Sequence, residues 1–188
     1  FFLFILQGFG IPKFISYGHT KKYNILIEEL LGNSLKDLFI PKQGKCNLID
    51  ICLTGIQLVD RLEWIHSKNI IHRDIKPENF LIGLNDPNII YIIDFGSCKK
   101  YRSSKTGKHV TPKNTNKFNG TILFSSANVL RGKEPSRRDD LISLGYLLIF
   151  LIKKKLPWDF DSKQKDIRNY LKSLKIKEPA VNIGIVGK

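Results

Sequence analysis

The sequence contains no methionine among its 188 residues. Because translation starts with methionine, we expect the sequence to be a fragment of a longer chain. Cysteine is also scarce: Cys46, Cys52 and Cys98 are odd in number and lack the close paired spacing of metal ligands, so they predict neither a disulfide framework nor a zinc site. This cysteine usage favours a reducing, intracellular location, in the cytoplasm, the nucleus or both.

Long apolar runs are missing as well. The apolar stretch over residues 141–152 covers twelve residues, fewer than the ~20 that a membrane span needs, and it is better interpreted as a buried helix. The apolar start, FFLFIL, lacks the basic region and the small-residue cleavage site of a signal peptide. The sequence therefore predicts no membrane span.

Acidic residues are few. Lysine and arginine outnumber aspartate and glutamate by 31 to 17, which gives a net charge of +14. This balance favours acidic partners such as phosphoproteins, nucleic acid or an anionic membrane, although a solvated lysine-rich surface fits it equally well. Hydrophobic residues at 42% and charged residues at 26% are ordinary for a globular protein, and the length suits one core or one incomplete large domain.

The pattern of apolar residues predicts mixed secondary structure. We expect two strands over residues 14–19 and 23–29, a short helix over 34–40 capped by Asn33, and short strands in FLIG and IIYIID. Spacings of three and four predict a helix over residues 48–66, with a buried face formed by Ile49, Cys52 or Leu53, Ile56, Val59, Leu62 or Glu63, and Ile65. Further helices are expected over residues 139–154 and 162–175.

A polar, lysine-rich segment separates the two groups of elements. Residues 94–128 show no periodicity and are too long for an idle connection within a compact domain. Long ordered loops tend to be functional, so we expect this segment to take part in the activity of the protein.

The stretch HRDIKPEN places charged and amide side chains between apolar flanks. Asp74 and Asn79 follow the spacing H-R-D-x-x-x-x-N, and Asp94 of DFG lies twenty residues beyond Asp74. Phosphoryl transfer needs an aligned hydroxyl, neutralised phosphate charge and held metal ions. Asp74 can accept the hydroxyl proton and Lys76 can steady the transferring group. Asn79 and Asp94 offer oxygen ligands that Mg²⁺ prefers, so we expect a site for ATP and Mg²⁺.

These two motifs together form the protein-kinase signature, and further stretches are similar to one family. The sequence resembles casein kinase I serine/threonine kinases from about Gln7 to Trp158. The similarity is carried by LLGNSLKDLF (30–39), EWIHSKNIIHRDIKPENFLIG (63–83), YIIDFGSCKKYR (91–102), NGT with SSAN (119–128) and SRRDDLISLGYLLIF (136–150). SAN in place of the usual Ala-Pro-Glu, followed by SRRDD, is particularly typical of that family.

The resemblance implies an α+β, protein-kinase-like fold. Residues 1–30 would be the end of the N-lobe, with the end of helix C, strands 4 and 5 and the hinge, and residues 31–188 would be a mainly helical C-lobe that stops after helix G. Within it we expect a catalytic loop at 72–79, an activation segment at 94–128 and helix F at about 139–154.

Individual roles follow from the same resemblance. The backbone of Leu31 and the carbonyl of Glu29 would contact the adenine ring, and Thr121 would lie beside Asp74 and Lys76 in the substrate-binding loop. Asp140 would accept hydrogen bonds from the backbone after residue 71. Lys76 implies serine or threonine substrates rather than tyrosine. The expected partners are ATP, Mg²⁺ and acidic or phosphorylated proteins, bound by a monomer with no specific affinity for nucleic acid.

The sequence also departs from the family. No glycine-rich loop, strand lysine or helix-C glutamate is found upstream of residue 70, so we expect these 188 residues alone to phosphorylate little or nothing. Glu28 stands where the family has an apolar gatekeeper, and its desolvation should raise its pKa or draw in a partner such as a lysine. Leu123 replaces an anion-binding arginine, while Lys117 remains basic.

Two other interpretations stay open. A pseudokinase or scaffold would keep the fold without the chemistry; Glu28 favours it, whereas the intact Asp74, Lys76, Asn79 and Asp94 oppose it. A nucleic-acid-binding module rests on net charge alone and predicts strongly salt-dependent binding.

Overall fold

The computed structural model describes residues 2–40, 47–111 and 118–159. The described elements are α1 (Phe2–Leu6), β1 (Phe14–His19), β2 (Asn24–Glu28), α2 (Leu35–Phe39), α3 (Leu48–Ser67), β3 (Ile70–Ile71), the 3₁₀ turn η1 (Pro77–Asn79), β4 (Phe80–Ile82), β5 (Ile90–Ile92), the 3₁₀ turn η2 (Phe95–Ser97), β6 (Lys99–Lys100), the 3₁₀ turn η3 (Ile122–Phe124), α4 (Ala127–Leu130) and α5 (Arg137–Lys153). The helix expected over 162–175 lies outside the described residues.

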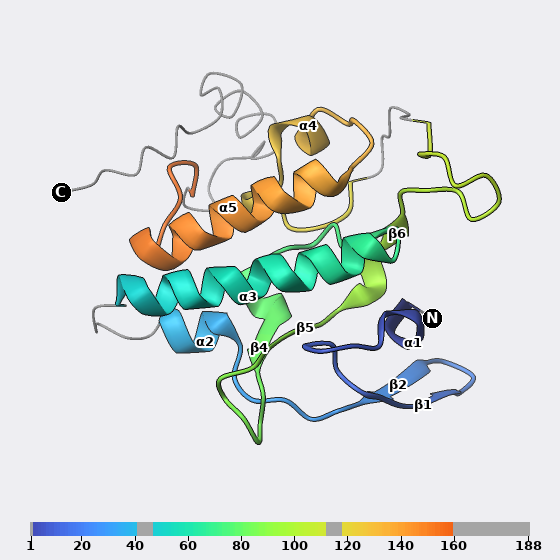
Figure 1. Cartoon of the computed structure of the whole chain (residues 1–188), viewed down its shortest axis with the longest axis horizontal. Coiled ribbons are helices and arrows are strands. Elements are labelled where there is room, and N and C mark those ends of the chain that lie inside the picture. The colour runs from blue at the N-terminus through green and yellow to red at the C-terminus, as the bar shows by residue number, and fades with distance from the viewer. Residues whose placement is uncertain (1, 41–46, 112–117, 160–188) are drawn as a thin grey trace.

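Two long helices, α3 and α5, lie side by side and run in opposite directions (Figure 1). Apolar side chains of both helices are buried, among them Leu58, Leu62, Leu144 and Leu147, all at most 3% exposed. Gly55 of α3 faces the Leu148 side chain of α5, where an added Cβ would make ordinary van der Waals contact at 3.4 Å. Both helices were predicted from their apolar periodicity, and both are confirmed within two residues at each end.

The buried face of α3 differs from the predicted one. Leu62 and Ile65 are buried as predicted, but Ile49, Leu53, Ile56 and Val59 are 47–63% exposed. The rest of the buried face is formed by Ile51, Thr54, Gly55, Leu58, Arg61 and His66. The prediction was wrong for the first part of the helix because α3 carries apolar residues on two sides, and spacing alone cannot decide which side meets the core.

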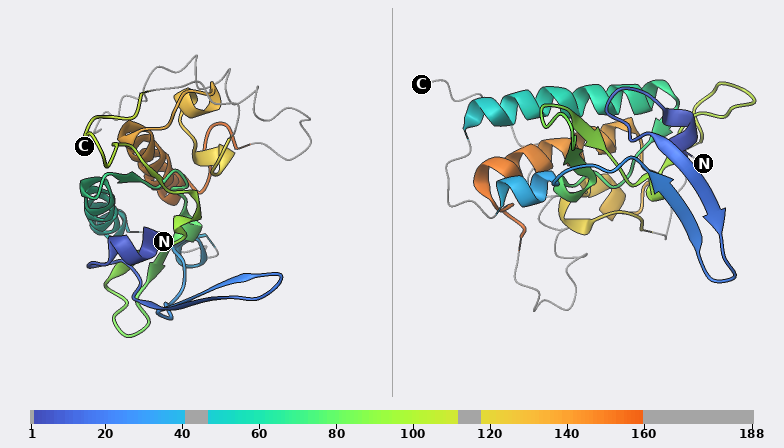
Figure 2. Two further views of the ribbon diagram at one scale, coloured as in Figure 1. Left: turned by 90° about the vertical axis from the view of Figure 1, so that its right-hand side faces the viewer. Right: turned by 90° about the horizontal axis from the view of Figure 1, so that it is seen from below.

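The described residues form three antiparallel two-stranded sheets: β1 with β2, β3 with β6, and β4 with β5. The β1–β2 hairpin confirms the predicted strand pair and projects away from the helical body (Figure 2). The short helix α1 joins the body, since Leu3 and Leu6 are buried and the Trp64 indole donates to the Leu6 carbonyl at 2.7 Å. The architecture is therefore α+β, with long helices and small sheets.

Helix α2 begins later than predicted. Its N-cap is Ser34, whose hydroxyl accepts the Asp37 N–H, and not Asn33. The Asn33 carbonyl instead accepts the N–H of Ile82, and the Ile82 carbonyl accepts the N–H of Gly32. This extended pairing with β4 holds residues 32–33 out of the helix, so the helix starts one residue further on.

Candidate active site

A buried carboxylate anchors the loop that contains HRDIKPEN. Asp140, 2% exposed in α5, accepts the backbone N–H groups of His72 and Arg73, each at 2.9 Å. The His66 ring, at the end of α3, lies 2.9 Å from the same carboxylate. The two backbone hydrogen bonds are those expected from the resemblance, whereas the contact of His66 was not expected. Since Arg73 has a φ of 71°, the anchored N–H groups also hold the loop in a left-handed turn that side chains rarely adopt.

Asp74 lies at the centre of a cluster of polar side chains. Its two carboxylate oxygens accept from the Thr121 hydroxyl at 2.8 Å and contact the Lys76 ammonium at 2.8 Å. The Asn79 amide donates to the Asp74 carbonyl at 2.8 Å. The structure thus brings together three side chains that the sequence places in phosphoryl transfer, those of Asp74, Lys76 and Asn79 in the loop around η1. Thr121, which the resemblance placed beside them, joins them from the segment before η3.

Gly120 allows this convergence. Its φ is 105°, a conformation that favours glycine, and a Cβ at this position would lie 2.4 Å from the Arg73 carbonyl oxygen. The backbone of the 118–124 segment therefore rests directly against the catalytic loop, which puts Thr121 within hydrogen-bonding distance of Asp74.

Both charged groups of the cluster keep their charge. Burial alone would raise the pKa of Asp74, but hydrogen bonds from Lys76 and Thr121 outweigh burial and hold this pKa below its usual range. Burial would lower the pKa of Lys76, but its hydrogen bond and its attraction to Asp74 outweigh that and raise it. At neutral pH the cluster therefore contains a carboxylate able to accept a proton beside an ammonium group.

His72 links this cluster to the DFG segment. Its Nε2 lies 3.0 Å from the Ile93 carbonyl and its Nδ1 lies 3.3 Å from the Asp74 N–H. A carbonyl only accepts and an N–H only donates, so the ring is the neutral tautomer with its proton on Nε2. Burial agrees, because it lowers the pKa of His72. The histidine is a structural link and not a catalytic base.

Asn79 and Asp94 are neighbours across the β4–β5 hairpin. The Ile93 N–H donates to the Asn79 carbonyl at 3.0 Å, directly before Asp94. Asp94 is exposed, has a φ of 62° and accepts the Gly96 N–H at 3.2 Å. The turn of η2 therefore presents the Asp94 carboxylate at the mouth of the site.

These residues fit Mg²⁺. The Asn79 amide nitrogen donates to Asp74, which leaves the amide oxygen as its free ligand atom, and Asp94 adds an exposed carboxylate. Among the described residues no group of three or more histidine, cysteine, aspartate or glutamate side chains could hold a metal ion. Mg²⁺ needs no such group, since it is commonly held by one or two protein oxygens together with substrate phosphates.

A cavity of about 380 Å³ lies between β2, the segment that follows it and the β4–β5 hairpin. It is lined by Glu29 and Leu31, the two residues expected to contact adenine, and by Leu81 and Ile93 on the opposite wall. Apolar walls beside main-chain polar groups suit a flat heteroaromatic ring. Ile93 directly precedes Asp94, so the cavity lies beside the segment that carries this carboxylate.

Glu28 lines the same cavity and is half-buried. Desolvation raises its pKa, and the negative charge of Asp94 raises it further. The expected rise is confirmed. The sequence also predicted that a lysine could be drawn toward Glu28, and no ion pair of Glu28 is found among the described residues.

A comparison with family models decides the identity of the fold. The model described as protein kinase domain matches residues 6–183. The chain belongs to the protein kinase family. Family membership implies a transferase that binds ATP and phosphorylates proteins. No helix within the described ranges is long and apolar enough to cross a membrane.

Sequence reasoning missed several residues of this kinase domain. His66 was given no role, yet it contacts Asp140. Gly120 was noted only within NGT, and the requirement for glycine there comes from a contact with a loop 47 residues away, from Arg73 to Gly120. The ion pair of Lys36 with Glu78, at 2.8 Å, was also missed. Local sequence carried no signal for any of these long-range contacts.

Proposed function

We propose that the protein is a serine/threonine kinase of the casein kinase I type that transfers the γ-phosphoryl group of ATP to acidic or phosphorylated protein substrates. One observation carries the proposal: the Asp74 carboxylate is buried between a hydroxyl and an ammonium group, 2.8 Å from each. This arrangement orients a general base beside a positive charge, which is the combination that phosphoryl transfer requires.

Each residue has a distinct task in the proposed reaction. The oxygen of the substrate hydroxyl attacks the γ-phosphorus, and Asp74 takes the hydroxyl proton. The bond between the γ-phosphorus and the oxygen that bridges it to the β-phosphate breaks, and ADP leaves. Lys76 stabilises the negative charge of the transferring group, and Thr121 keeps the Asp74 carboxylate oriented. Backbone groups of Glu29 and Leu31 bind adenine. Asn79 and Asp94 would hold Mg²⁺, which would neutralise phosphate charge.

The casein kinase I type is supported by two stretches that resemble that family. SSAN and SRRDD are joined by a hydrogen bond of 2.6 Å from the Ser126 hydroxyl to the Asp139 carboxylate. The same hydroxyl caps α4, and Asp139 also accepts the Ser136 N–H at the start of α5 at 2.8 Å. The two stretches therefore form one unit beneath the substrate-binding loop, in place of an Ala-Pro-Glu anchor.

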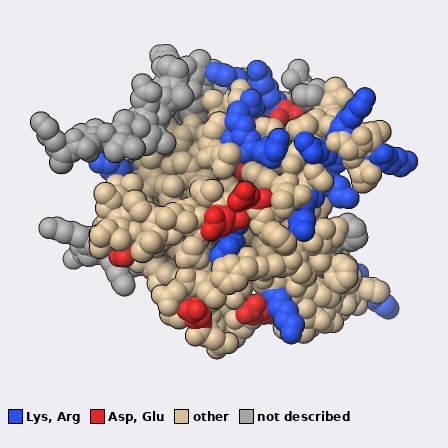
Figure 3. All heavy atoms as spheres, viewed as in Figure 1, with Lys and Arg blue, Asp and Glu red and all other residues tan. Residues whose placement is uncertain are grey.

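Acidic substrates are supported by the distribution of charge. Lysine and arginine side chains gather over the upper and right-hand parts of one face of the molecule (Figure 3). The exposed basic residues of residues 100–138 are Lys100, Arg102, Lys105, Lys108, Arg131, Lys133, Arg137 and Arg138. Several follow Asp94 within the activation segment, so they would attract acidic sequences toward the site. Lys113 and Lys117 lie outside the described residues.

The proposal is tested by incubating the full-length protein with Mg²⁺, ATP and casein and measuring phosphate transfer. We expect phosphoserine and phosphothreonine, and transfer that stops when Mg²⁺ is chelated. The 188 residues alone are expected to transfer little or nothing, because the phosphate-covering loop and the strand lysine are not among them. A full-length protein that binds ATP without any transfer would identify a pseudokinase instead.

Glu28 provides a separate prediction. Replacing Glu28 with glutamine removes a carboxylate that is repelled by Asp94 and by the phosphates of a nucleotide. We expect the Kd of the full-length protein for ATP to fall severalfold, by less than about tenfold because Glu28 is partly exposed. Titration calorimetry in the presence of Mg²⁺ measures the change. Glu63→Gln, an exposed site on α3, is the matched control. An unchanged or weaker affinity in Glu28→Gln would show that this side chain does not face the nucleotide.

A further inference from the structure

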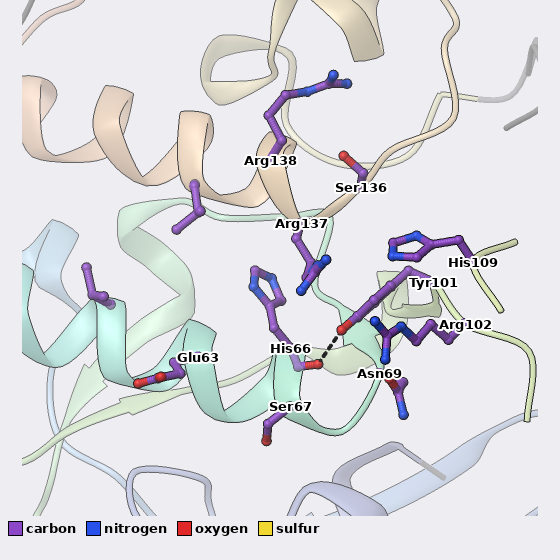
Figure 4. A pocket seen from close by; sticks show the side chains of 12 residues that line it. Glu63, His66, Ser67, Asn69, Tyr101, Arg102, His109, Ser136, Arg137 and Arg138 are labelled. Atoms are coloured by element: carbon purple, nitrogen blue, oxygen red, sulfur yellow. Dashed lines mark hydrogen bonds between the residues drawn. The ribbon is translucent and has the colours of Figure 1, made fainter. Parts of the chain in front are cut away.

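A large groove lies outside the site described above. It has a volume of about 800 Å³ and runs between the last turns of α3, the start of α5 and the segment after β6 (Figure 4). Its lining residues are Val59, Glu63, His66, Ser67, Asn69, Tyr101, Arg102, His109, Ser136, Arg137, Arg138 and Leu141. No residue of the adenine cavity is shared with it.

The groove is basic at one end. The guanidinium groups of Arg102 and Arg137 lie 5.9 Å and 4.8 Å from the centre of the Tyr101 ring, and Figure 4 shows both side chains beside that ring. Within the described part of the chain, neither arginine forms an ion pair, whereas Arg138 pairs with Asp139. Two positive charges beside one ring, neither with an acidic partner among the described residues, favour a ligand that carries more than one carboxylate.

The ring between the arginines is fixed. Tyr101 is 8% exposed, its hydroxyl donates to the His66 carbonyl at 2.7 Å, and the His109 ring lies 5.3 Å away. Contact with this fixed ring restricts the motion of the two guanidinium groups before a ligand binds. Less conformational entropy is then lost when the ligand binds.

The other part of the groove is apolar. Val59 of α3 is 47% exposed and Leu141 of α5 is 48% exposed, and both line the groove. Only one acidic side chain, that of Glu63, is among the lining residues. A ligand that fills the groove therefore needs negative charge at one end and an apolar group next to it. A peptide has both, whereas a polyanion such as nucleic acid would leave the apolar part unfilled.

We propose that this groove binds an acidic peptide segment of a protein partner. Glutamate or aspartate side chains contact Arg102 and Arg137, and an adjacent leucine or phenylalanine packs against Val59 and Leu141. This inference does not depend on kinase activity, since binding to the groove is measured directly. The groove also lies next to the catalytic loop, because His66 in its wall contacts the Asp140 carboxylate that holds that loop.

Fluorescence anisotropy of the full-length protein with a short fluorescein-labelled peptide of alternating glutamates and leucines tests the proposal. We expect Arg102→Glu with Arg137→Glu to weaken binding by about tenfold or more. Lys21→Glu with Lys22→Glu makes the same change of charge in the exposed β1–β2 turn, and its affinity should stay within about threefold of the wild type. Val59→Ser with Leu141→Ser should weaken binding as well.

Two altered peptides test the same groove without relying on the folding of a variant. Replacing the glutamates by glutamines, or the leucines by serines, should each abolish binding to the wild-type protein. The proposal would be overturned if the arginine and the lysine double variants lost affinity equally. It would also be overturned if the peptide with serines in place of leucines bound as tightly as the original. Either result would show general attraction to positive charge. Single-stranded DNA that competes better than the peptide would overturn it in favour of nucleic acid.

Discussion

Replacing Asp74 with asparagine is expected to lower the kcat of the full-length protein by roughly 10²–10⁴-fold, with little change in the KM for ATP. Asparagine has the shape of aspartate, so it can still contact Thr121 and Lys76, but it cannot take the proton of the substrate hydroxyl. Steady-state kinetics with casein and Mg²⁺-ATP measure the effect.

Asp60→Asn is the matched control, because Asp60 is exposed on α3, and its kcat should equal that of the wild type. A wild-type kcat in Asp74→Asn would mean that another group accepts the proton, and a raised KM with an unchanged kcat would assign Asp74 to binding alone. The pKa of Asp74 lies below its usual range, so this carboxylate stays ionised above about pH 4. Any loss of rate between pH 5 and 8 should therefore not come from Asp74.

Asp140→Ala is expected to lower the free energy of unfolding by on the order of 3 kcal/mol. The substitution leaves the N–H groups of His72 and Arg73 without their acceptor and removes the partner of His66. Urea denaturation measures the change. Hydrogen exchange of the His72 and Arg73 amides should become faster, because both would lose their hydrogen bonds.

The control for this prediction is Asp60→Ala, an exposed change that should alter stability by less than about 0.5 kcal/mol. Asp140→Asn retains one acceptor oxygen and should fall between Asp140→Ala and the wild type. If Asp140→Ala unfolds at the same urea concentration as the wild type, the buried carboxylate contributes little. Unchanged amide exchange would show that the loop is held by other contacts.

The long helices and the first hairpin were predictable because they follow from residue types that are close together in the sequence. The ends of α3 and α5 follow from apolar periodicity, and the β1–β2 hairpin follows from β-branched residues on either side of a polar turn. The start of α2 was not predictable to the residue, because it depends on the pairing of residues 32–33 with β4. The buried face of α3 depends likewise on which neighbours it meets.

The residues of the site also differ in whether local sequence was enough to predict them. Asp74, Lys76 and Asn79 are close together in sequence, so their spacing was sufficient to group them, and DFG added Asp94. The placement of Thr121 beside Asp74 and the hydrogen bonds to Asp140 were expected from resemblance and not from local pattern. The groove around Tyr101 had no sequence signal, because its two arginines lie 35 residues apart, at Arg102 and Arg137, and the fold brings both to the same tyrosine ring.

The contact at Gly120 contains no side chain. Loops that touch through side chains can adjust by changing rotamers, but here the α-carbon of one loop rests against the carbonyl of the other. A shift of residues 118–124 would therefore carry Thr121 away from Asp74 without any intermediate residue to absorb the movement. If Asp74 is the base that we propose, its orientation would change whenever this segment moves.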